Sequence, residues 1–254
     1  MKGLKLRLGM GFAIIGLTAI NLQADVLAAF YTFGSVNNQS STTDPTPAPA
    51  LSGVVFGSFT AVGYSGNPAA AGRFSWASNE TGGMNGDDNF ADFKGNLNEG
   101  KYFEVTLAPQ ASRTLDIDRI TFGVRRSSTG IRSYAMRSSL DNFSANLPGS
   151  VNPPNPNLGI GPDNSFRWLF DGASTTSDQT GSRVDLGNAF DALGSPVTFR
   201  FYGWNAESSA GIFSIDDVCF LIGDAQVPEP GCTTSLFLGM VVFGVERRRR
   251  HRSP

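Results

Sequence analysis

Almost all the residues that could do chemistry in this chain of 254 are carboxylates, hydroxyls and arginines, because its single histidine is His251, close to the C-terminus. A chain body without histidine lacks the usual general base of serine and cysteine nucleophiles and the usual zinc ligand. It also has neither GxGxxG after a strand nor GxxxxGK[ST], so nucleotide chemistry has no support.

Two carboxylates are enough for glycoside hydrolysis, and the candidates are Glu80, Glu104, Asp116 and Asp118. Asp116 and Asp118 are spaced i,i+2, however, which is typical of the solvent face of a strand. We therefore name no catalytic residue and predict that the protein is not an enzyme. A secreted glycan-active enzyme that uses a carboxylate pair is the alternative.

Arginines and aromatic residues offer a second chemistry, the binding of sugars. Tyr134 and four arginines fall around one expected strand pair and could line a sugar-binding face: Arg125, Arg126, Arg132 and Arg137. The alternative is a solvated face whose charges are balanced by Asp116, Asp118 and Asp141. The three tryptophans, Trp76, Trp168 and Trp204, are expected in the core rather than on a binding platform.

The elements that must position these residues are strands. Phe is frequent, Gly, Ser, Asn and Pro are abundant, and no segment keeps a 3.6-residue period, so we predict an all-β fold. The expected strands, nine or ten in number, include 30–33, 53–64, 102–107, 115–124, 131–139, 166–170, 183–186, 197–204 and 211–222. Residues 40–50, 79–100 and 147–162 are expected to be loops. Strands about ten residues apart without helices between them indicate a two-sheet β-sandwich over residues 25–226.

One strand shows a phase slip. Leu115 and Ile117 alternate in one phase, whereas Ile120, Phe122 and Val124 are one step out. A bulge near Arg119 would restore the register.

Both ends of the chain differ from this body. Residues 1–24 place Lys and Arg before a short apolar run and small residues, the pattern of a signal peptide. Residues 227–254 contain Val227-Pro228-Glu229-Pro230, an uncharged segment at 232–245 and Arg247, Arg248, Arg249 and Arg250. As a helix, 232–245 would span only about 21 Å, a marginal transmembrane segment. Its arginines would stay on the cytoplasmic side.

Charge excludes one class of partner. Residues 25–226 hold 12 of the 20 basic residues and 20 of the 22 acidic ones, so their net charge is −8. Nucleic-acid binding needs a positive face, and we therefore expect no nucleic-acid partner. The terminal arginines belong instead to membrane sorting.

The C-terminal residues 227–254 resemble the sorting domain of PEP-CTERM proteins of Gram-negative bacteria. That resemblance implies export, transient anchoring in the inner membrane and cleavage by an exosortase near the Pro-Glu-Pro motif. The product would then reach the cell surface or the extracellular polysaccharide. The resemblance departs at Glu246, which lies between the apolar segment and the arginines, and at Thr233 and Thr234.

The body resembles the jelly-roll β-sandwich exoproteins that carry such tails, through YFEVTL, LDIDRITFGVRRSS, VTFRFYGW and FSIDDV in that order. The resemblance implies a structural calcium ion near the last strand. Asp216 and Asp217, together with Asp87 and Asp88, could supply part of the six to eight oxygens that calcium requires. The alternative is that these are ordinary turn residues.

Overall fold

The computed structural model describes residues 26–77, 79–172 and 177–223. The expected signal helix at 1–24, the sorting motif Val227–Pro230, the expected transmembrane segment at 232–245 and the arginines 247–250 lie outside these residues. Within the described ranges, no helix is long and apolar enough to cross a membrane.

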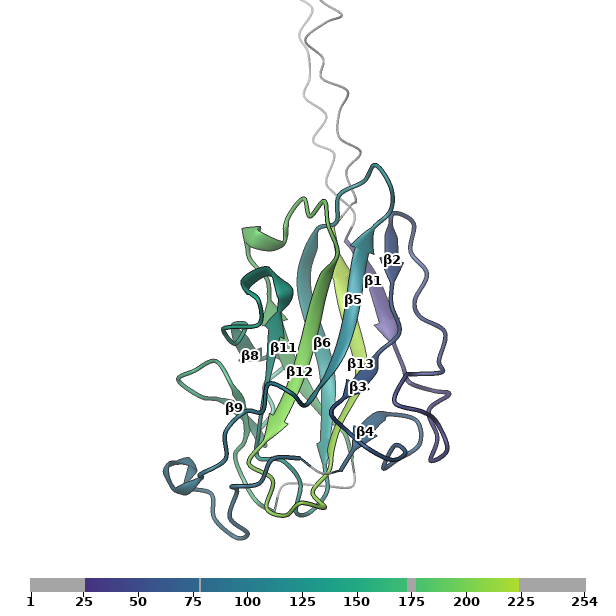
Figure 1. The fold of residues 1–254 in the computed structure, drawn as a ribbon. Helices are drawn as coiled ribbons and strands as arrows, with labels where there is room; N and C mark the ends of the chain where they lie inside the picture. Colours follow the sequence, from purple (N-terminus) through teal and green to yellow (C-terminus); the bar gives the residue numbers. More distant parts are fainter. Residues whose placement is uncertain (1–25, 78, 173–176, 224–254) are drawn as a thin grey trace, which may run out of the picture.

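The described residues form two antiparallel sheets and no α-helix, which confirms the predicted β-sandwich (Figure 1). The six-stranded sheet, sheet A, has the order β1-β13-β6-β11-β8, with β4 also paired to β13. The seven-stranded sheet, sheet B, has the order β2-β5-β12-β7-β10-β9, with β3 also paired to β5.

The strands of sheet A are β1 (Leu27–Tyr31), β4 (Phe74–Trp76), β6 (Ile117–Arg126), β8 (Gly149–Val151), β11 (Gln179–Asp185) and β13 (Phe213–Ile222). The strands of sheet B are β2 (Val54–Phe56), β3 (Thr60–Val62), β5 (Tyr102–Pro109), β7 (Ser133–Ser138), β9 (Leu158–Ile160), β10 (Phe166–Trp168) and β12 (Val197–Trp204). Short 3₁₀ turns lie at η1 (Phe90–Asp92), η2 (Ser139–Asp141) and η3 (Asn188–Phe190).

Several expected elements have different bounds in the structure. The strand expected at 197–204 is β12, but the segment expected at 53–64 is divided into β2 and β3. The prediction of a loop at 147–162 is wrong, since this segment contains β8 and β9, and β4 was not predicted. The strands β2, β3, β4, β8 and β9 are each three residues long, too short for a period of two to be visible.

Two bulges set the phase of the central pair, β6 and β13. Leu221 pairs with Arg119 but Ile222 pairs with Ile117, so β6 has an extra residue at Asp118, next to the predicted position. The second shift lies on β13 between Asp216 and Cys219. There Asp217 has a φ of 45°, and the bulge returns the apolar residues that follow to the interior.

The core between the sheets is built mainly from phenylalanine rings of both. Phe103 of sheet B is 0 % exposed and stacks on Phe213 of sheet A, with ring centroids 5.1 Å apart. Trp76 and Trp168 lie in this core, as predicted. Trp204 lies in a second, smaller cluster with Tyr102, Ala135 and Tyr202.

The first and last strands begin and end at the same end of the sandwich. Leu27 of β1 lies opposite Ile222 of β13, at the upper end in Figure 1. From Ile222, β13 reaches back over its ten residues, roughly 30 Å, to Phe213 at the opposite end. There Phe213 pairs with Arg126 of β6 and with Trp76 of β4.

Truncating a core ring tests this packing. We expect Phe103→Ala to lower the free energy of unfolding by about 3–5 kcal/mol, because its ring packs against three rings of the opposite sheet, those of Phe74, Trp76 and Phe213. Phe30→Ala, at a ring that is 56 % exposed, should change it by less than about 0.5 kcal/mol. Urea unfolding of the two variants measures both, and equal losses would contradict the packing.

Candidate functional site

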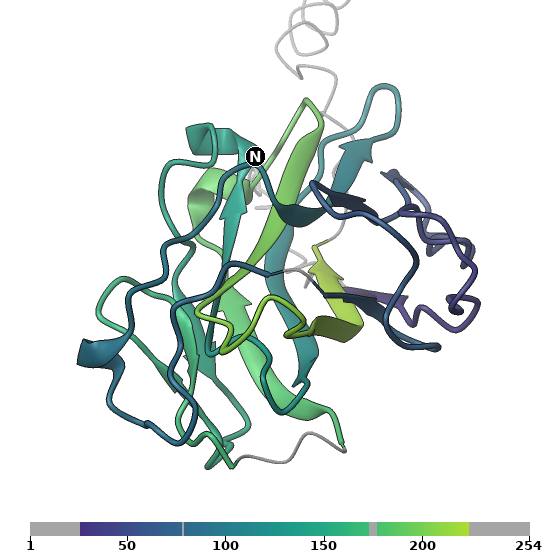
Figure 2. The same ribbon diagram turned by 60° about the horizontal axis from the view of Figure 1, so that its bottom comes forward.

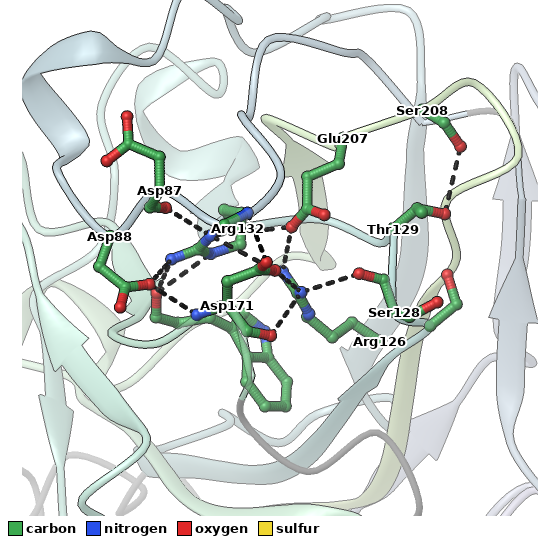
Figure 3. Close-up of polar contacts among 12 residues, drawn as sticks. Asp87, Asp88, Arg126, Ser128, Thr129, Arg132, Asp171, Glu207 and Ser208 are labelled. Atoms are coloured by element: carbon green, nitrogen blue, oxygen red, sulfur yellow. Dashed lines mark hydrogen bonds and ion pairs between the residues drawn. The ribbon is translucent and has the colours of Figure 1, made fainter.

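A cluster of charged side chains, most of them buried, lies at the end of the sandwich opposite Leu27 and Ile222, the end that is turned forward in Figure 2. It contains Arg126 at the end of β6, Arg132 just before β7, Asp171 after β10 and Glu207 after β12. Asp88, from the long loop that precedes β5, completes it. Figure 3 shows these side chains converging, and we call them the buried ion network.

Arg126 is fully buried and most of its hydrogen-bonding capacity is used. Its Nη1 donates to Glu207 Oε1 at 3.0 Å, and its Nη2 donates to Asp171 Oδ1 at 2.7 Å. Nη2 also donates to the carbonyl oxygens of Ser128 and Asp171, both at 3.0 Å. One guanidinium therefore joins three separate loops.

Arg132 is also fully buried and joins the long loop to the others. Its Nη2 donates to Asp88 Oδ1 at 3.0 Å, and its Nη1 donates to the carbonyl oxygen of Asp87 at 2.9 Å. The same Nη1 lies 3.7 Å from Asp171 Oδ1. Asp88 Oδ1 in turn accepts the backbone N–H of Asp171 at 2.6 Å. The two arginines therefore share their carboxylates, as Figure 3 shows.

The surroundings drive the pKa values of the two central carboxyls in opposite directions. Burial raises the pKa of Glu207, and the neighbouring Asp171 raises it further. Burial alone would also raise the pKa of Asp171, but hydrogen bonds from Glu207, the Gly86 amide and Arg126 outweigh it and lower that pKa. Of the two carboxyls, Glu207 is thus the one that holds a proton more readily.

An opposed carboxyl pair is the arrangement of a general acid and base, but Glu207 of this pair is closed off from solvent. The side chain of Glu207 is 1 % exposed and that of Asp171 is 17 % exposed. A catalytic acid must reach the group that it protonates. The network therefore acts as a structural clamp: it neutralises two buried arginines and holds together the loops at this end.

The prediction that the four arginines and Tyr134 form one face is wrong, because β6 and β7 belong to different sheets. Tyr134 points into the core, where it is 1 % exposed and its hydroxyl lies 2.9 Å from Ser182 Oγ. The alternative of a solvated face also fails for Arg126 and Arg132, whose partners are Asp88, Asp171 and Glu207. Asp116, Asp118 and Asp141 are not among those partners.

Arg137 and Arg200 lie instead beside aromatic rings of sheet B, on the face away from the core. Arg200 lies between Tyr102 and Phe143, with its guanidinium carbon 4.0 and 3.7 Å from the two ring centroids. Arg137 lies over Tyr202 at 5.5 Å. These contacts stabilise an outer aromatic layer, because a cation is attracted to a ring face.

The four carboxylates considered for hydrolysis are separated by the fold. Glu104 is on β5 and pairs with Arg200, whereas Glu80 follows β4 and pairs with Lys101. Asp116 and Asp118 are at the start of β6 in the other sheet, on either side of buried Ile117. The structure therefore gives no reason to single out a carboxylate pair among these four residues.

The residues considered for calcium are also divided between two places. Asp87 and Asp88 bind Arg132, whereas Asp216 and Asp217 form the bulge of β13. In the ranges that the structure describes, no group of three or more His, Cys, Asp or Glu side chains could hold a metal ion. The four aspartates therefore do not make one calcium site.

Replacing Glu207 tests the clamp. We expect Glu207→Ala to lower the free energy of unfolding by about 3 kcal/mol, because a buried arginine loses a partner while Asp171 remains. Glu207→Gln keeps an acceptor for Arg126 Nη1, so it should cost much less. Thermal unfolding monitored by circular dichroism measures both. Equal losses for the two variants would show that the network contributes only packing.

Asp216 gives a pH-dependent test. Burial, assisted by the negative charges of Asp217 and Asp178, raises the pKa of Asp216 from 3.8 to about 6. The folded state then binds more protons than the unfolded state between these values, so this group's stabilising contribution is lost as pH rises through about 6. We expect Asp216→Asn to be more stable than the parent at pH 7 and similar to it below pH 4, as measured by unfolding at each pH. A difference that does not vary with pH would contradict this.

Comparisons of the chain with protein-family models, with curated proteins and with solved structures give no match. The function must therefore be argued from the residues themselves.

Proposed function

We propose that this protein is an exported, exosortase-processed component of the bacterial cell surface or extracellular matrix. Its β-sandwich would have a binding or structural role and no enzymatic one. The observation that carries the proposal is the C-terminal order of Val227–Pro230, an uncharged segment and Arg247–Arg250. The export pattern at residues 1–24 supports it. On this proposal the protein is held briefly in the inner membrane, with exosortase as its transient partner.

The geometry of the described body suits such a route. Because Leu27 lies opposite Ile222, the export segment and the sorting tail would leave the sandwich at one end. The other end carries the buried ion network and the long loops, which Figure 1 shows at the bottom, and it would face away from the membrane during anchoring. A surface for partners outside the cell would then be available before the tail is removed.

The proposed binding partner is extracellular polysaccharide, and the proposed architecture is jelly-roll-like. Two packed antiparallel sheets with long loops at one end support a binding role, because such loops on a rigid scaffold commonly carry recognition. The separation of Glu80, Glu104, Asp116 and Asp118 gives the glycan-active alternative no assembled acid and base.

Intact-mass analysis of the protein isolated from its own host tests the route. We expect a mature chain that lacks residues 1–24 and also lacks Arg247–Arg250. Replacing both Pro228 and Pro230 by alanine should leave the tail attached, because the cleavage enzyme would lose its motif. A control replacement of Thr233 by serine should be processed normally.

Two results would overturn the proposal. A mature protein that retains its arginines would be a permanently anchored membrane protein. Release of reducing sugar from a polysaccharide by the purified protein, abolished by replacing one carboxylate, would establish the glycan-active enzyme.

A further inference from the structure

A pocket of ≈ 270 Å³ lies beside the buried ion network and is lined by arginine and serine side chains. Three guanidinium groups contribute to it, those of Arg73, Arg125 and Arg126. Among its described lining residues, none is an aspartate or a glutamate. The charged residues that line the pocket are therefore all basic, on a body whose net charge is −8.

The register of sheet A explains how these side chains meet. Ser214 of β13 pairs with Arg125 of β6 and with Ser75 of β4, so the three side chains form one row across the sheet. The next row points the other way and is fully buried in the core: Phe74, Val124 and Ile215. The row of Ser214 thus faces outward, and the hydroxyls of Ser75 and Ser214 lie 2.7 Å apart in it.

Two of the arginines have donors that the chain does not satisfy. The Nη atoms of Arg126 bind Glu207, Asp171 and Ser128, but its buried Nε has no acceptor. Arg73 donates from Nη2 to Asp178 at 3.3 Å, and its buried Nε also has no acceptor. A guanidinium stays charged at all ordinary pH values, so these donors cannot be removed by titration. The lining residues Arg73 and Arg126 therefore remain cationic at the pH of any binding experiment.

We propose that this pocket binds an oxyanion group, a carboxylate or a sulfate, carried by an acidic polysaccharide. Guanidinium groups match the planar fork of a carboxylate or two oxygens of a sulfate, and serine hydroxyls donate to the same oxygens. A volume of ≈ 270 Å³ suits one charged group with its sugar better than a long segment of polymer. The polysaccharide as the carrier rests on the proposed function, whereas the oxyanion chemistry rests on the pocket alone.

The buried ion network prepares the pocket for this ligand. Arg126 belongs to both, because its Nη atoms are held in the network and it is also one of the residues that line the pocket. The network thus fixes one wall of the pocket before a ligand binds. Asp178 competes with a ligand for the pocket, because it pairs with Arg73.

Titration calorimetry of the full chain with sodium sulfate at constant ionic strength tests the pocket. We expect Arg125→Gln to raise the Kd at least about tenfold, since a charge-assisted contact is lost. Asp178→Asn should lower the Kd, because Arg73 is released from its partner. The matched control is Arg119→Gln, on the same strand but paired with Asp185 outside the pocket, which should leave the Kd within about twofold.

Two controls distinguish a loss of sulfate binding from a loss of the folded structure. Arg125→Lys keeps the charge but loses the fork, so its affinity for sulfate should fall between those of the parent and Arg125→Gln. Each variant is compared with the parent by near-ultraviolet circular dichroism. No sulfate binding by the folded parent, or equal binding by the parent and the folded arginine variants, would overturn the inference.

Binding measurements with three polysaccharides distinguish failure of this inference from failure of the proposed function. Polygalacturonate and dextran sulfate should bind through Arg125, whereas neutral dextran should bind more weakly. Binding of neutral and acidic polymers alike, unchanged in Arg125→Gln, would overturn the oxyanion site and leave polysaccharide binding in place. Sulfate binding through Arg125 without binding of any polymer would keep the site and overturn the polysaccharide as its carrier.

Discussion

The constraint on which this end of the molecule depends is the burial of two positive charges. Arg126 and Arg132 are each 0 % exposed, and a guanidinium cannot shed its proton to escape the cost of leaving water. The fold meets that cost by bringing carboxylates from three other segments to them, at Asp88, Asp171 and Glu207. The long loops at this end are therefore held in place by charge neutralisation.

The same clamp also sets what the neighbouring surface can offer. Arg126 is held from one side by the network and lines the arginine-serine pocket on the other. A carboxyl buried at 1 % exposure is unsuited to proton transfer with a substrate, but it is well suited to hold an arginine in a fixed position. This arrangement is the physical basis of the oxyanion binding that we propose for the pocket.

The sequence predicted the class of fold because alternation is strong in the long strands. β12 and the bulge of β6 next to Arg119 follow from the phase of their apolar residues. Strands of three residues are too short to show such a phase. Which distant segments pair with each other also cannot be read from the local sequence of either segment. This explains why β4, β8 and β9 were missed.

The site was predicted less well, although part of its signal was available. Arg126 continues the inward phase of Phe122 and Val124, just as Arg132 precedes the inward phase of Tyr134. An arginine at an inward position must be paired, so burial of both could have been inferred. The carboxylates that pair with them come from loops without periodicity, and only the folded chain identifies them. The slip between Ile215 and Val218 likewise marks the bulge at Asp217.

The position of the first strand has a mechanical consequence. β1 joins the sheet through five residue pairs to β13 alone, starting where β13 finishes. Tension applied between Leu27 and Ile222 would therefore break those pairs one after another, and would not load them all together in shear. β13 would remain paired with β6. In a pulled molecule, β1 would therefore detach and extend before the core of the sandwich bears any load.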